Sequence, residues 1–298
     1  MIAGLSAQLR AAIASDSRDL ARPALAVAAL AYPSLEAEPS LRMLDRLGAA
    51  AAARMAASVP DPLNTPAGVD PTTFAHASAI SSLLFTEEGF TGNDADYDDP
   101  RNSCLNAVLD RRTGMPLTLS IVFLEVARRA CLRADGVNFP GHFLVVCPSV
   151  SARYPHALLI DPHHGGTVLT ESMCRDLLDD TTDDDDAWDP ALLRPASTRQ
   201  ILTRLLLNLK RAYVRLHSFP QAREISALLL EIDPTATTEL RDHGLLSYQL
   251  RDYAGALRDL QRFLVGTARL TTDEDDRDDQ ARIWEHVKTL QRRLAGLN

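Results

Sequence analysis

The sequence predicts an α+β protein in which helices predominate, and three observations carry this prediction. Apolar residues recur at helical spacing in the N-terminal region, as Leu5, Leu9 and Ile13 illustrate. Several short β-type runs then follow one strongly apolar helix without alternating with further helices, which is typical of α+β rather than α/β proteins. The last third of the chain is helical again and repeats with a period of 34 residues.

Composition and charge exclude several classes of protein. The chain has 298 residues, of which 46% are hydrophobic and 24% are charged, and this is typical of a soluble globular protein. Its net charge of −9 is unsuited to collecting phosphates, so we expect no nucleic-acid partner. The longest apolar stretch, residues 24–32, is about half of a bilayer span, and the N-terminus lacks the regions of a signal peptide. We therefore expect no membrane partner and a cytoplasmic location.

The N-terminal region, residues 1–70, is predicted to be helical. A first helix ends at a break near Asp16–Ser17, and residues 20–32 continue the helical pattern. Residues 41–57 form a further helix that ends in an alanine-rich run, which suits close helix packing and offers no chemistry. Residues 59–72 are rich in Pro, Asn, Asp and Gly and are predicted to be a connecting loop.

The central region, residues 71–190, is predicted to contain helices followed by strands. Gly114 ends one helix, and Pro116 is well placed to begin the next, which runs to about Ala130. This helix is apolar almost all the way round, so we expect it to be buried at the centre of the domain. The predicted helices before it are residues 72–85 and 102–112. The predicted strands after it are residues 137–139, 143–147, 158–160 and 167–169.

An acidic stretch, residues 176–189, is predicted to be a solvated linker. It holds four consecutive aspartates, Asp183–Asp186, and few apolar residues. Carboxylate runs can bind calcium, but the glycine-punctuated pattern of a calcium loop is absent, so the linker interpretation is preferred.

The cysteines are predicted to be reduced and mostly buried. The chain has four of them, scattered without a CxxC spacing: Cys104, Cys131, Cys147 and Cys174. Such usage favours a reducing compartment over a disulfide framework or a structural zinc site.

The C-terminal region, residues 196–298, is predicted to form helical repeats. Two pairs of equivalent residues lie 34 positions apart, namely Phe219 with Tyr253 and Ala222 with Ala256. A 34-residue period in helix–turn–helix units resembles the tetratricopeptide repeat. Because two such repeats are fewer than stack stably alone, we expect the helix at residues 284–294 or the preceding domain to cap them.

The most strongly patterned residues form five short motifs in the central region. They are Gly89-Phe90-Thr91-Gly92-Asn93, Asp99-Pro100-Arg101-Asn102-Ser103, Arg111-Arg112-Thr113-Gly114-Met115-Pro116, Pro140-Gly141-His142-Phe143 and Ile160-Asp161-Pro162. Followed by tetratricopeptide-like repeats, these motifs resemble the bacterial SirB-type regulator family over roughly residues 20–270. The central domain of that family belongs to the transglutaminase-like superfamily, so the resemblance implies a transglutaminase-like core and a regulatory role.

The superfamily resemblance implies a papain-like arrangement of three catalytic residues, of which this chain keeps two. In that arrangement a cysteine begins a buried helix, a histidine begins one strand and an aspartate ends the next. The helix dipole and a neighbouring imidazolium stabilise the thiolate, and the aspartate orients the imidazole. His142 and Asp161 match the histidine and aspartate positions, whereas Pro116 stands where the cysteine belongs.

No neighbouring side chain is placed to act as a dipole-activated nucleophile. At 100° per residue, Ser120 lies about 40° from position 116 around the helix, but it is one turn deeper, about 6 Å along the axis. Cys104 lies on the preceding helix, and Cys131 lies near the far end of the apolar helix, about 22 Å from its start.

Two functional hypotheses follow. The first, which we favour, is a non-catalytic scaffold that keeps His142 and Asp161 for structure or ligand contact and acts in protein–protein interaction or regulation. The second is a cysteine- or serine-dependent hydrolase or acyltransferase acting on protein amides, in which Ser120 would complete a triad with His142 and Asp161. A thiol or hydroxyl within hydrogen-bond reach of a His142 ring nitrogen would favour the second hypothesis.

Metal binding is a third interpretation of the same region. Imidazole and carboxylate groups suit zinc, and five such residues fall close together in sequence: His142, His156, Asp161, His163 and His164. The adjacent histidines diverge in an extended segment, although in a turn one of them could approach Asp161. Because histidines in turns are more often surface residues, we predict neither a metal nor another cofactor.

The predicted partner is another protein or a peptide. Tetratricopeptide repeats commonly hold an extended peptide or a helix in their concave face, so the resemblance assigns partner binding to the C-terminal region. In the first repeat that face should involve Asn208, Arg211, Tyr213 and Arg215.

Overall fold

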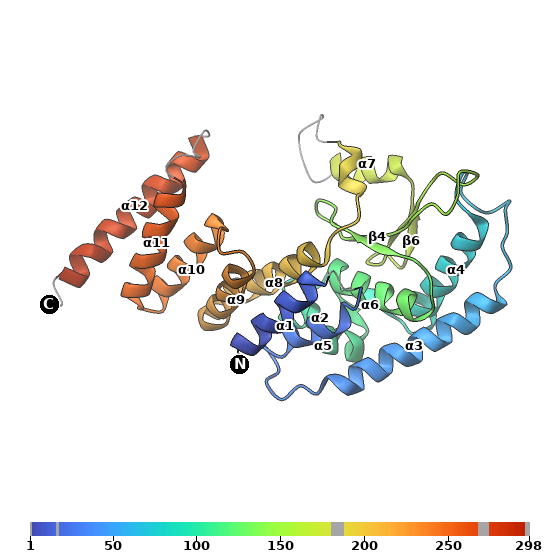
Figure 1. Cartoon of the computed structure of the whole chain (residues 1–298), viewed down its shortest axis with the longest axis horizontal. Helices are drawn as coiled ribbons and strands as arrows, with labels where there is room; N and C mark the ends of the chain where they lie inside the picture. Colours follow the sequence, from blue (N-terminus) through green and yellow to red (C-terminus); the bar gives the residue numbers. More distant parts are fainter. Residues whose placement is uncertain (1, 16–17, 180–187, 268–273, 296–298) are drawn as a thin grey trace. The chain divides into compact units, whose positions relative to one another are not determined.

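The computed structural model describes residues 2–15, 18–179, 188–267 and 274–295 (Figure 1). Its chain divides into two compact units, one formed by Gln8–Leu205 and the other by Met1–Ala7 with Leu206–Asn298. The predicted break at Asp16–Ser17 and the four consecutive aspartates lie outside the described residues. The three domain ranges predicted from the sequence stay predictions.

A central buried helix organises the first unit, as the sequence predicts. Residues 116–127 of helix α6 (Pro116–Arg129) are all buried. Helices packed around it include α2 (Ala21–Ala28), α3 (Ala37–Ala57), α4 (Pro71–Ser81) and α5 (Leu105–Arg111). Further helical segments of this unit include residues 8–14 of α1 (Ile2–Ala14), a π-helix at Ser82–Glu87 and 3₁₀ turns at Pro100–Ser103 and Pro190–Leu193.

Four short antiparallel strands cover one side of α6. They are β3 (Asp135–Val137), β4 (Leu144–Cys147), β5 (Leu158–Asp161) and β6 (Thr167–Leu169), paired in that order. The helix packs on β3 and β4. Helix α7 (Glu171–Asp179) places Cys174 and Leu178 in the same apolar cluster as Leu144 and Leu159 of the sheet. The sheet therefore has helical cover from two elements (Figure 1).

Two local features differ from the sequence prediction. Helix α7 occupies part of the stretch that was predicted to begin a solvated linker at residue 176. The acidic composition of this segment suggests a solvated chain, but two of its residues, Cys174 and Leu178, are buried. They are four residues apart and so share one helix face. In addition, β1 (Thr91–Gly92) and β2 (Thr113–Gly114) form a parallel pair that is too short to give a sequence pattern.

The second unit is a set of antiparallel helix pairs with the predicted repeat. Its helices are the end of α8 (Thr198–Arg215), then α9 (Phe219–Ile232), α10 (Thr237–Gln249), α11 (Tyr253–Thr267) and α12 (Glu274–Ala295). The turns before α9 and α11 use the same left-handed backbone, at His217 (φ 54°) and Arg251 (φ 62°), which lie 34 residues apart. Ala222 and Ala256 are both fully buried. These equivalences confirm the repeat.

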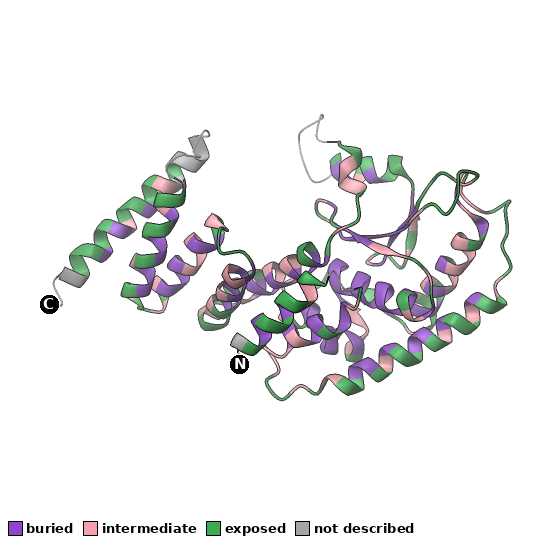
Figure 2. Ribbon diagram, in the orientation of Figure 1, coloured by how far each residue is buried: buried purple, intermediate pink, exposed green. Residues whose placement is uncertain are grey.

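The predicted cap on the repeats is α12. Three of its residues, Ile283, Val287 and Leu290, are buried in a cluster with Leu260 and Phe263 of α11. Figure 2 shows the alternation of buried and exposed residues along these helices, which is typical of helices that each bury one face. None of the helices in the described ranges combines the length and apolar character that a bilayer span requires.

Candidate functional site

Backbone geometry brings the predicted histidine and aspartate to one end of the sheet. Asp161 is the last residue of β5, and His142 lies two residues before its neighbour β4. The turn from β5 to β6 is closed by a hydrogen bond from the Gly166 N–H to the Asp161 carbonyl, and Gly165 and Gly166 both have a positive φ. This turn carries the side chain of His164 back towards Asp161.

Asp161 is the centre of the candidate site. Its Oδ1 accepts hydrogen bonds from the backbone N–H groups of His163 (2.9 Å) and His164 (3.4 Å). Its Oδ2 lies 2.7 Å from His164 Nδ1 and 3.7 Å from His142 Nδ1. One carboxylate oxygen is thus fixed by the backbone, and the other faces two imidazole rings.

The site has a charged carboxylate at neutral pH. The Asp161 side chain is only 2% exposed, and burial alone would raise its pKa. The facing imidazoles of His142 and His164 and the N–H of His163 outweigh that effect and lower the pKa of Asp161 to about 2. The carboxylate therefore stays charged throughout the physiological range, where it can accept a hydrogen bond from an imidazole N–H and orient the ring.

The other two histidines of the metal interpretation lie elsewhere. His163 Nε2 is 2.9 Å from Asp94 Oδ1, and its ring packs so closely on Gly92 that a Cβ there would lie 2.4 Å from it. His156 Nδ1 is 3.0 Å from the carbonyl oxygen of Ala67. The structure therefore separates the five candidates into a cluster of three, formed by His142, Asp161 and His164, and two residues with their own partners.

The described hydroxyl side chains near the start of α6 have hydrogen-bond partners other than His142. Pro116 is the first residue of α6, and the hydroxyl of Thr118 is engaged with the Asn102 carbonyl at 2.6 Å. Ser120 is fully buried and donates to the Phe143 carbonyl at 2.9 Å. Among the residues that the structure describes, no cysteine or hydroxyl side chain hydrogen-bonds to His142, and its buried Nδ1 has no hydrogen-bond partner.

The cysteines lack the surroundings of a reactive thiolate. All four are free in the structure, and three of them are buried, as predicted for most of the cysteines. Burial raises the pKa of Cys104 to about 12, with a further contribution from the charge of Asp99. Burial likewise raises the pKa of Cys147 to about 12 and that of Cys174 to about 11. Cys131 is exposed, and it lies just after the C-terminal end of α6, far in sequence from the helix start where a dipole would activate it.

The four residues predicted to bind a partner all lie on α8, but they do not share one face. Asn208, Arg211 and Arg215 project within about 60° of one another, whereas Tyr213 lies at least about 140° away from each of them. Arg211 and Arg215 are exposed, and Asn208 and Tyr213 are partly buried.

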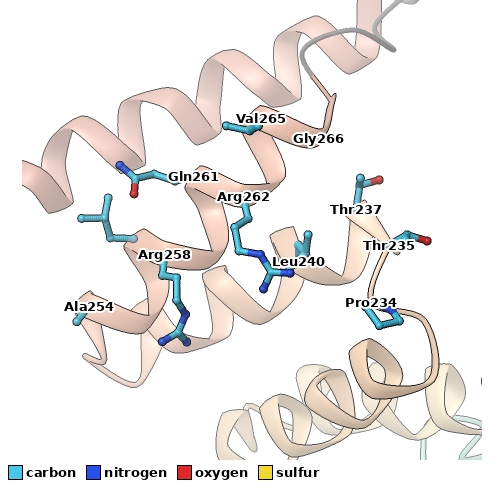
Figure 3. Close-up of a pocket in the computed structure, with 11 residues that line it drawn as sticks. Pro234, Thr235, Thr237, Leu240, Ala254, Arg258, Gln261, Arg262, Val265 and Gly266 are labelled. Carbon is cyan, nitrogen blue, oxygen red and sulfur yellow. The ribbon is translucent and has the colours of Figure 1, made fainter.

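A second feature of the repeats, which sequence reasoning missed, is a groove of about 890 Å³ in the second unit. It is lined by α11, by Leu240 of α10 and by the loop that begins at Pro234. Figure 3 shows Arg258 and Arg262, one turn apart on α11, beside this space. Their spacing of four residues is the only sequence signal that could have indicated a basic groove wall.

Several known proteins are similar to parts of this chain. A protein of Xylella fastidiosa named UPF0162 protein is 39% identical over 191 residues, which are 63% of this chain and 66%, just under two thirds, of that protein. The UPF0162 protein of Pseudomonas aeruginosa is 31% identical over 205 residues, 69% of this chain and 71% of that protein. F-box only protein 21 of Mus musculus is 42% identical over 67 residues, 22% of this chain and 11% of that protein.

Two family profiles match the chain. The tetratricopeptide repeat profile matches residues 209–290. The profile of the transglutaminase-like superfamily matches residues 38–207, which is more than half of the chain. The chain therefore belongs to the transglutaminase-like superfamily and, within it, to the SirB-type family of UPF0162 proteins, with tetratricopeptide repeats after its core.

Proposed function

We propose that this protein is a non-catalytic scaffold that acts in protein–protein interaction or regulation through its repeats. The observation that carries this proposal is the occupant of the nucleophile position. Proline at the first position of α6 has no thiol or hydroxyl, and the nearest hydroxyl on the same helix stripe, that of Ser120, is fully buried and committed to a carbonyl. The proposal therefore assigns no covalent catalysis to this site.

The repeats support the interaction part of the proposal. Tetratricopeptide repeats bind peptides or helices in grooves between their helices, and the groove on α11 has the size of a ligand-binding site. Arg258 and Arg262 give one wall positive charge, while Leu240 and Val265 give it apolar surface. We therefore propose an acidic, partly apolar peptide segment of another protein as the partner. The exposed arginines Arg211 and Arg215 of α8 form the second candidate surface.

A comparison of charge-reversed full-length variants tests the proposal. Partners captured by the wild-type chain would be compared with those captured by Arg258→Glu/Arg262→Glu and by Arg211→Glu/Arg215→Glu. The control is Arg282→Glu/Lys288→Glu, which changes the net charge equally on the exposed face of α12. We expect one of the first two variants to lose a partner that the control retains. Retention of every partner by both variants would contradict the proposed surfaces.

The rival function is hydrolysis or acyl transfer on protein amides. The observation that favours it is the retained pair of His142 and Asp161, whose Nδ1–Oδ2 distance is 3.7 Å. Such an enzyme would release ammonia from a glutamine-containing protein, and the His142→Ala variant would not. We expect no ammonia release from either protein.

A further inference from the structure

The residues at the end of β5 form a ligand set that the proposed function does not use. One potential ligand atom of each of His142, Asp161 and His164 lies within 4.8 Å of those of the other two. The three come from two neighbouring strand ends and the turn that follows, so the backbone and not a flexible loop tip holds them together. We propose that these three side chains bind a divalent transition-metal ion, with Zn²⁺ as the representative ion.

The distances suit such an ion. Zinc bonds imidazole nitrogen and carboxylate oxygen at roughly 2.0–2.2 Å, so neighbouring ligand atoms in a tetrahedral site lie about 3.4 Å apart. The two Nδ1–Oδ2 distances here are 2.7 Å for His164 and 3.7 Å for His142. Small movements of the two rings, which shift His164 Nδ1 by about 0.7 Å and His142 Nδ1 by about 0.3 Å relative to Oδ2, would bring both distances to the required value.

The buried nitrogen of His142 is the second observation that points to a ligand. Its Nδ1 is inaccessible to solvent, and the nearby Asp161 Oδ2, at 3.7 Å, lies beyond ordinary hydrogen-bond distance, although the side chain as a whole is 18% exposed. A buried polar atom without a partner is costly, and such atoms in a folded protein call for an explanation. Coordination of an ion held between His142 and Asp161 would satisfy this nitrogen.

Backbone hydrogen bonds orient the Asp161 carboxylate in the way that is usual for a metal-binding carboxylate. The backbone N–H groups of His163 and His164 hold Asp161 Oδ1, which leaves Oδ2 directed at the two rings. Fixed hydrogen bonds to the second oxygen are the usual support of a metal-binding carboxylate. Because the His164 side chain is 55% exposed, the site is open to solvent on one side, and water can supply the remaining ligands.

The site would have the composition of two histidines and one carboxylate with open positions. Zinc, iron(II) and similar ions accept this donor set, whereas calcium and magnesium prefer oxygen ligands alone. Cysteine plays no part in this site. The charge of Asp161 contributes to the raised pKa of Cys174, but the Cys174 side chain is packed in the apolar cluster of the sheet and α7.

Zinc and cobalt titrations of the untagged full-length protein test this inference. After treatment with a chelator, Zn²⁺ would be titrated in a calorimeter, and Co²⁺ would be followed by its visible absorption. We expect one ion per chain, with binding weakened roughly tenfold or more in His142→Ala and in His164→Ala. The matched control is His156→Ala, a histidine outside the cluster whose ring contacts Ala67, and we expect it to bind as the wild type does.

Two outcomes of these titrations would contradict the proposed metal site. Absence of stoichiometric Zn²⁺ binding by the wild-type protein would overturn the inference, and so would equal affinity in all four proteins. Because His164 is largely exposed, its variant is expected to fold, and circular dichroism would establish this before the titration. These readouts do not depend on the partner of the repeats, so failure here leaves the proposed scaffold function intact.

Discussion

Proline at position 116, which the superfamily resemblance aligns with the nucleophile, is the first residue of α6. The first position of a helix tolerates proline because its N–H would be unpaired there in any case. The Thr118 hydroxyl accepts from the Met115 N–H and donates to the Asn102 carbonyl, so the helix start is held without an active-site cysteine. Proline at this position is thus compatible with a well-formed start of α6.

At the same scale, the reactivity of the cysteines is directly testable. Burial and raised pKa values make Cys104, Cys147 and Cys174 poor nucleophiles, whereas Cys131 is exposed. We expect a maleimide at neutral pH to add one label to the native chain and four to the denatured chain, as counted by intact mass. The variant Cys131→Ser should take up none in the native state. Rapid labelling of Cys104 in the native protein would contradict the structure.

At the scale of the elements, a buried ion cluster joins three helices of the repeats. Lys210 of α8 is 7% exposed, and its Nζ lies 2.6 Å from Glu239 Oε1 and 2.8 Å from Asp242 Oδ2 on α10. Ser226 of α9 donates to Glu239 Oε2 at 2.9 Å. Such a cluster fixes the register of neighbouring helices. Removal of one partner leaves the opposite charge buried without a counter-charge, which destabilises the fold.

The only two lysines of the chain provide a matched test of this cluster. Lys210→Ala leaves a buried carboxylate uncompensated, so we expect a loss of about 3 kcal/mol in the free energy of unfolding. Lys288→Ala removes an exposed pair with Glu285 and should cost less than about 1 kcal/mol. Urea denaturation followed by circular dichroism measures both values. Equal losses in the two variants would contradict a structural role for the buried lysine.

The elements differ in how well the sequence predicts them, for physical reasons. The buried helix α6 and the four strands were predicted because long apolar runs and tight turns leave strong patterns. Helix α7 was not predicted, because its sequence is acidic and has only two buried apolar residues on one face. These residues stabilise the helix by packing against the sheet, and this contact is not visible in the local sequence. The parallel pair β1–β2 has two residues per strand and no pattern to detect.

The candidate site was predicted only in part. The match of His142 and Asp161 to the superfamily positions depends on the resemblance, and the structure brings the two side chains together. The sequence allows one of two adjacent histidines to approach Asp161 in a turn but does not fix which of them turns inward, and in the structure it is His164. In the structure His164 faces Asp161, whereas His163 pairs with Asp94, which lies 69 residues away in the sequence.

At the scale of the whole molecule, buried ionised groups predict how stability depends on pH. Asp259 is 3% exposed, and its Oδ2 lies 2.7 Å from His243 Nδ1. Burial would raise its pKa, but His243 and Arg258 lower it below the ordinary value of 3.8. A group with a lowered native pKa stabilises the fold above its unfolded pKa, and this contribution is lost as the pH falls below that value.

The pH dependence can be assigned to this residue with one variant. We expect the urea midpoint of the wild-type protein to fall as the pH is lowered from about 5 to about 3. In Asp259→Asn the midpoint at neutral pH should be lower, and the decrease on acidification should be smaller, because the titrating group is gone. An unchanged pH dependence in the variant would show that other carboxylates carry the effect.

The most direct measurement for the whole protein is a search for a covalent intermediate. The full-length chain and its His142→Ala variant would be incubated with an activated acyl ester and with a glutamine-containing peptide, then quenched in acid and weighed intact. A scaffold without a nucleophile should show the same mass distribution in both proteins. An acyl adduct on a serine or cysteine of the wild-type chain that disappears in His142→Ala would contradict the central claim.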